Sequence, residues 1–196
     1  MNPTEPLQQS RASDRSALAA EQSRTGQAPN QAYPWPWTGY SDKPDEMPLS
    51  GYAALLAAYA AVFGPLWVVL WSRRRRTGAD RPSIADAVLL GIATHKIGRI
   101  ITKDWVTSPI RAPFTEYVES EGGGEVSERS RGQGLQRAVG DLLTCPWCIA
   151  PWVAGALYSA FLINPHAARM LAAGATSVAA SDFLQHALNA SKRLSK

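Results

Sequence analysis

The sequence has few of the residues from which most active sites and metal centres are built. It contains only two cysteines and three histidines in 196 residues, and charged residues make up 18%, against roughly 25% in an average protein. No histidine stands at metal-ligand spacing from the cysteines, and no set of nucleophile, base and oxyanion donors is visible. We therefore expect no metal, no cofactor and no catalytic residues, and we favour a protein that is not an enzyme.

An apolar signal segment is also missing from residues 1–50, so we expect the first hydrophobic helix to direct the chain to the membrane. Few aliphatic residues occur in residues 1–48, which predicts a disordered polar and proline-rich tail. The aromatic cluster at residues 33–37 is open to two interpretations. It lies on a membrane interface, where tryptophan is favoured, or it belongs to a linker without a role.

The excess of basic residues does not indicate a nucleic-acid-binding protein. The formal net charge is +4 and the sequence pI is about 9.3. However, the arginines and lysines stand at the edges of apolar segments, whereas a nucleic-acid binder interleaves them with recognition elements. This placement is typical of a membrane protein. We expect the lipid bilayer as a partner, together with other membrane proteins or a second copy of the chain, and no nucleic acid.

The first apolar segment, residues 51–71, contains no charged residue. About 20 apolar residues in a helix cross the roughly 30 Å of bilayer hydrocarbon, so this segment predicts a transmembrane helix. Four basic residues follow it at once: Arg73, Arg74, Arg75 and Arg76. They predict a cytoplasmic helix end that binds anionic lipid headgroups.

Two further apolar segments, residues 142–163 and 168–190, predict a second and a third span. Between the first two spans, residues 106–141 read as a solvated loop, and residues 191–196 read as a basic tail. The sequence thus predicts an all-α fold. It would be a small multi-pass helical membrane protein with three transmembrane helices, one amphipathic or fourth membrane helix, and a membrane domain covering residues 49–190.

The ambiguous helix is residues 83–105. Ser83 and Asp86 predict a capping box at its start. Its first half is apolar, whereas its second half is amphipathic. The helix either spans the bilayer with its charged face in a bundle or lies in the cytoplasmic interface. The positive-inside rule favours the second arrangement, which keeps the loop at residues 106–141 cytoplasmic.

An intramembrane polar network is predicted around Asp182, which lies midway along the third span. A lone carboxylate is too costly in hydrocarbon, so it needs a partner. His186 lies one turn further along, and His95, Lys96 and Arg99 share one face of the ambiguous helix. We expect Arg99 or Lys96 to reach Asp182.

The two cysteines, Cys145 and Cys148, have the spacing of thiol–disulfide enzymes and stand near a helix N-terminus, where thiols ionise more readily. The βαβ pattern that usually accompanies such a redox motif is missing from the sequence. Three interpretations remain open: packing of two polarizable residues, a redox or disulfide pair, and a metal site.

Two blocks, residues 86–114 and residues 140–148 with Trp152, resemble the YjcA-like family of small bacterial membrane proteins. The spacing that carries the resemblance comprises the cysteine pair with Arg99, Asp104, Arg111, Pro113 and Phe114. The resemblance implies a short multi-pass membrane protein in a family with a sporulation-linked branch, and it implies no biochemical activity. We expect an interaction or scaffold component of the bacterial cytoplasmic membrane. The alternative is a thiol–disulfide redox protein or sensor that uses Cys145 and Cys148.

Overall fold

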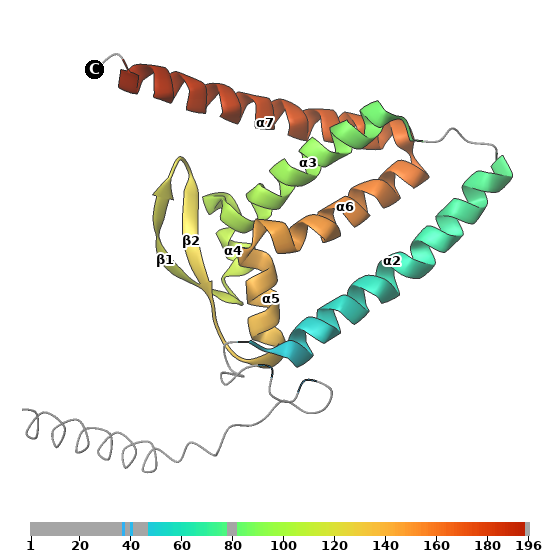
Figure 1. Cartoon of the computed structure of the whole chain (residues 1–196), viewed down its shortest axis with the longest axis horizontal. Helices are drawn as coiled ribbons and strands as arrows, with labels where there is room; N and C mark the ends of the chain where they lie inside the picture. Colours follow the sequence, from blue (N-terminus) through green and yellow to red (C-terminus); the bar gives the residue numbers. More distant parts are fainter. Residues whose placement is uncertain (1–36, 38–39, 41–46, 78–81, 195–196) are drawn as a thin grey trace, which may run out of the picture. The chain divides into compact units, whose positions relative to one another are not determined.

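The computed structural model describes residues 37, 40, 47–77 and 82–194. Most of the predicted disordered tail and the last two residues of the basic tail lie outside this part of the chain. Two units divide the chain, Met1–Leu49 and Ser50–Lys196, and the elements of Figure 1 belong to the second unit apart from the first residue of α2. In order they are α2 (Leu49–Thr77), α3 (Ile84–Lys103), η1 (Trp105–Thr107), α4 (Ser108–Arg111), β1 (Thr115–Gly122), β2 (Glu125–Ser130), α5 (Gly134–Thr144), α6 (Pro146–Ile163) and α7 (Pro165–Leu194).

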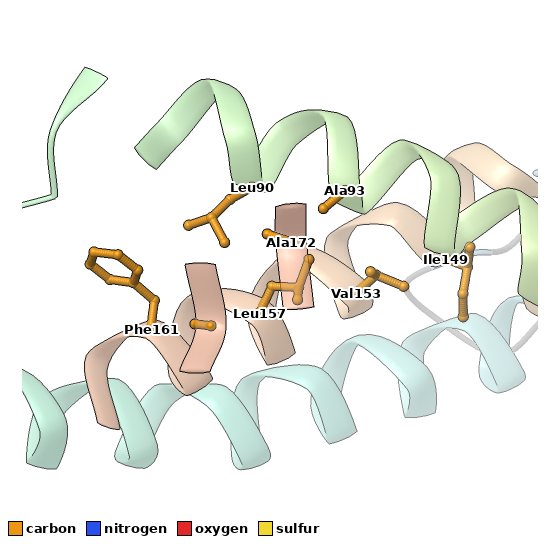
Figure 2. Close-up of a cluster of buried hydrophobic side chains, with 8 residues drawn as sticks. Leu90, Ala93, Ile149, Val153, Leu157, Phe161 and Ala172 are labelled. Atoms are coloured by element: carbon orange, nitrogen blue, oxygen red, sulfur yellow. The ribbon is translucent and has the colours of Figure 1, made fainter. Parts of the chain in front are cut away.

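Helix α3 begins at the predicted capping box. The Ser83 hydroxyl accepts a hydrogen bond from the Asp86 N–H at 3.1 Å, and the Asp86 carboxylate accepts one from the Ser83 N–H at 3.0 Å. From this start α3 runs antiparallel along α6. Leu90 lies near Phe161 at one end of the shared hydrophobic cluster and Ile149 lies at the other (Figure 2). A Cβ on Gly98 of α3 would lie 3.5 Å from the Ile149 side chain. The helix therefore lies along α6 for most of its length.

Helices α2 and α6 run parallel, joined by a ladder of aromatic contacts. The Tyr59 ring lies 5.3 Å from that of Trp152, and the Trp67 indole N–H donates to the Ser159 hydroxyl at 3.0 Å. Between these contacts, a Cβ on Gly155 would lie only 2.9 Å from the Phe63 ring. Glycine at this position therefore leaves room for the Phe63 ring against α6.

Helix α7 lies along α3 in the same direction. Arg169 near its start binds Asp86 near the start of α3, Thr176 donates to the Leu89 carbonyl at 3.4 Å, and Asp182 binds Lys96. Because α6 joins α7 through a short turn at Asn164, α3 and α7 both run opposite to α2 and α6.

The prediction of an all-α fold is wrong in one region. The expected loop at residues 106–141 contains a two-stranded antiparallel hairpin, β1–β2, together with η1, α4 and most of α5. Gly122, Gly123 and Gly124, with φ of 81°, 62° and 88°, supply the left-handed backbone of the hairpin turn. Pro109 stands in the first turn of α4, where proline is tolerated.

The boundary of the second span also differs from the expected one. Helix α5 ends at Thr144 and a new helix begins at Pro146, because Cys145 is in extended conformation with ψ of 109°. Among the described residues, two helices are long and apolar enough to cross a membrane, Leu49–Arg76 and Pro146–Ile163. By length and composition alone, α3 and α7 are not identified as further crossings, although α7 contains the third expected span.

Candidate functional site

A polar cleft of about 800 Å³ lies between α3, α7 and the turn of the hairpin. All five residues of the predicted polar network line it: His95, Lys96, Arg99, Asp182 and His186. The hairpin contributes Gly123, Gly124 and Glu125, and α7 adds the amides of Gln185 and Asn189. Side chains far apart in the sequence thus meet because α3 and α7 run parallel and the hairpin folds back on both.

Two ion pairs cross the cleft. The Lys96 ammonium lies 2.7 Å from the Asp182 carboxylate, which is one of the two expected contacts. Arg99 binds Glu125 at the hairpin turn instead. Arg99 and Lys96 share one face of α3, so the sequence alone did not decide between them, and the position of the hairpin does.

A second ion pair, Arg111 with Glu128, fixes the hairpin to the end of α3. The Arg111 side chain is fully buried and that of Glu128 is 5% exposed. The guanidinium donates to both carboxylate oxygens, at 2.8 and 2.9 Å, and to the Ile101 carbonyl at 2.8 Å, with further bonds to the Thr107 hydroxyl, the Asp104 carbonyl and the Ser108 hydroxyl. A buried charge of this kind is stable only when its hydrogen bonds are satisfied.

The environment of Glu128 favours its ionised form. Burial alone would raise the pKa of this carboxyl, but hydrogen bonds from Arg111, Thr115 and Ser108 outweigh burial and hold the pKa below its ordinary value. The pair was missed in the sequence because Glu128 stands among acidic residues of a segment read as solvated. Arg111 was noted only through the family resemblance.

The opposite ends of the helices carry a basic cluster. The guanidinium groups of Arg74 and Arg169 lie 5.2 and 5.3 Å from the centre of the Phe161 ring, within the range of a cation–π interaction. Arg169 also donates to both oxygens of Asp86, at 2.6 and 2.9 Å. The four arginines predicted at the end of α2 therefore have a fifth cation beside them, which the sequence did not single out.

The cysteine pair lies at the start of α6, at the same end as the hairpin. Cys145 is the N-cap residue, and its Sγ accepts a hydrogen bond from the Cys148 N–H at 3.2 Å. Both thiols are free; Cys145 is half-buried and Cys148 exposed. In the described part of the chain, no group of three or more histidine, cysteine or carboxylate side chains could hold a metal ion.

The sequence matches known proteins over the same region. Residues 89–188 match a family described as "Protein of unknown function (DUF1360)". The sporulation protein YjcA of Bacillus subtilis (strain 168) is 33% identical over 87 residues, which cover 43% of this chain and 74% of that protein. No solved structure matches the chain. The family match includes most of α3, the hairpin, the cysteine pair and every cleft-lining residue except Asn189.

Proposed function

We propose a function from the geometry, because the chain belongs to the DUF1360 family of proteins of unknown function and this membership implies no reaction. The proposed function is that of a non-enzymatic interaction or scaffold component of the bacterial cytoplasmic membrane, which the chain crosses several times. One observation carries this proposal. Beside their shared hydrophobic cluster, α3 and α7 turn charged side chains toward one another and leave a set of large apolar side chains exposed.

Helix α3 illustrates the pattern. Each of its acidic and basic residues has an ion-pair partner on a neighbouring element, and the pairs are Asp86–Arg169, Lys96–Asp182, Arg99–Glu125 and Lys103–Glu121. Its exposed face instead carries Ile84, Val88 and Ile92. Charged groups at membrane depth face the interior and pair with one another, so this helix has the surface that lipid requires.

The second half of α7 repeats the pattern. Asp182, Gln185, His186 and Asn189 line the cleft together with Phe183, whereas Leu184 and Leu188 are not part of its lining and are 62% and 61% exposed. A helix with one polar and one apolar face normally turns the apolar face toward the protein core in water. Here the apolar face is turned outward, where the acyl chains of the bilayer would cover it.

The hairpin and the cleft form the part of the molecule best suited to contact other proteins or a second copy of the chain. The cleft contains two ion pairs, two histidines and two amides, and among the described residues these do not form a nucleophile–base arrangement. At the other end, the basic cluster around Arg74 and Arg169 suits anionic lipid headgroups. Both features fit an interaction protein better than an enzyme.

A matched pair of variants on α7 tests the proposal. Leu184→Asp places a charge on the outward apolar face, and Gln185→Asp places the same charge on the polar face. A membrane-embedded protein accumulates poorly with the first variant and normally with the second, and the unmodified chain resists extraction by alkaline carbonate but not by detergent. Release of the unmodified chain by carbonate, or equal accumulation of both variants, would overturn the proposal.

A thiol–disulfide redox role is the second candidate, favoured by one observation. The Cys145 Sγ caps the N-terminus of α6 and accepts a hydrogen bond from the Cys148 N–H, so the two cysteines lie side by side on the first turn of this helix. In this role the two thiols lose two electrons and two protons to a partner disulfide. Trapping of a mixed disulfide by Cys148→Ser but not by Cys145→Ser would support it, whereas thiols that remain reduced and inert to oxidants in membranes would exclude it.

A further inference from the structure

The direction of the helices constrains how the chain passes through a membrane. In the part of the chain that the structure describes, α2 and α6 are the two helices long and apolar enough to cross. The contacts between α2 and α6 follow the same order along both helices: Tyr59 contacts Trp152, Trp67 contacts Ser159, and Arg74 contacts Phe161. The two helices therefore cross in the same direction, and the chain between them has to return through the bilayer.

Helix α3 is the described segment that makes this return. Its 20 residues extend about 30 Å at 1.5 Å per residue, which matches the bilayer hydrocarbon. It begins beside the end of α6, through Asp86 and Arg169, and finishes beside the start of α6, where a Cβ on Gly98 would lie 3.5 Å from the Ile149 side chain. The hairpin and α5 stay at one end of α6 and do not run back along it.

Helix α7 runs along α3 and so crosses in the same sense. Its 30 residues exceed the thickness of the hydrocarbon, and beyond Asp182 it exposes Leu184 and Leu188, which do not line the cleft. Exposed tryptophans mark both interfaces: Trp105 and Trp147 at the hairpin end, and Trp71 beside the basic cluster. Tryptophan is enriched at membrane–water interfaces, and these positions bracket α2, α3 and α6.

The geometry points to four crossings, α2, α3, α6 and α7, with the outward apolar faces of α3 and α7 against lipid acyl chains. The basic cluster then lies on one side of the membrane, and the hairpin, the cysteine pair and the end of α7 lie on the other. Five arginines, Arg73–Arg76 and Arg81, lie in the short connection after α2, whereas the basic residues of the other side are spread over a longer loop and the C-terminal tail. We assign the side with this dense cluster to the cytoplasm. This inference rests on the proposed membrane location, and it reverses the expectation that residues 106–141 are cytoplasmic.

Three exposed serines serve as reporters: Ser72 beside the basic cluster, Ser120 near the hairpin turn, and Ser191 near the end of α7. Ser72→Cys, Ser120→Cys and Ser191→Cys are introduced singly into the full chain carrying Cys145→Ser and Cys148→Ser. Intact cells are treated with a membrane-impermeant maleimide, and a second sample is permeabilised first. We expect positions 120 and 191 to react in intact cells, and position 72 to react only after permeabilisation.

The other outcomes each contradict a defined part of the inference. Reaction of positions 72 and 120 from the same side shows that α3 does not cross, and reaction of positions 72 and 191 from the same side shows that α7 does not. Reversal of all three sides refutes the orientation. A position that reacts only in detergent lies within the bilayer or an interface between copies, which also overturns the assignment. Carbonate extraction of the same variants separately tests whether the chain is embedded at all.

Discussion

Removing the Arg111 side chain should release the hairpin from the end of α3. The variant Arg111→Met keeps most of the side-chain volume but leaves the buried Glu128 carboxylate without its cation. Six hydrogen bonds from the guanidinium are lost. Because stranding one partner of a buried pair typically costs about 3–5 kcal/mol, the population of molecules with an open hairpin should rise by about two to three and a half orders of magnitude.

Cleavage of the hairpin by a protease of broad specificity measures this population, because its rate follows the open fraction when opening and closing are fast. Arg129→Met is the matched control. Arg129 pairs with Glu116 at 3.2 Å, but the two side chains are 72% and 51% exposed, so its loss should change stability by less than about 1 kcal/mol. Adding Glu128→Gln to Arg111→Met should restore part of the resistance, since the stranded charge is then gone. Equal cleavage of the Arg111 and Arg129 variants would refute the reasoning.

Three further predictions follow from single contacts. The pKa of Glu128 is lower in the folded hairpin than its ordinary value of 4.5. As pH falls below that value, the unfolded hairpin therefore binds more protons than the folded one, and protease resistance should decline. Resistance should be unchanged between pH 6 and about 8. Gly155→Ala should lower the thermal stability in detergent by about 1–3 kcal/mol because of overpacking against α2, whereas Gly174→Ala, with open space around it, should not. Lys96→Ala and Asp182→Ala should each reduce folded protein more than the double change, and simple additivity of the two losses would contradict this.

Local features of the fold were predictable from the sequence, whereas features set by distant contacts were not. The capping box of α3 depends on Ser83 and Asp86 alone, three residues apart, so its sequence pattern was sufficient. The hairpin was missed because its strands are mostly polar: Val126 is the hydrophobic residue that they bury. The hairpin is instead stabilised by the pair of Arg111 and Glu128, which lie 17 residues apart.

The candidate site, too, was predictable in its local features but not in those set by distant contacts. Helical periodicity was enough to place His95, Lys96 and Arg99 on one face of α3 and to indicate that Asp182 needs a cation. It was not enough to choose that cation, because Glu125 competes for Arg99 and its position depends on the hairpin. The sequence favoured α3 on the membrane surface because each basic residue was counted as a separate charge. Such a count leaves out the ion-pair partner that each charged residue of α3 has in the structure.

In the proposed four-crossing topology, the pairing of its charges explains why hydropathy alone does not identify α3 as a span. A lysine or arginine facing lipid near the middle of a helix costs about 2.5–3.5 kcal/mol on insertion scales, so Lys96 and Arg99 together would cost roughly 5–7 kcal/mol. In the structure both side chains face α7 and the hairpin, where Asp182 and Glu125 neutralise them. The cost then depends on the formation of these pairs, which requires α7 and the hairpin to be in place. Helix α3 is therefore expected to enter the bilayer stably together with α7, and a chain truncated after α6 should leave α3 outside.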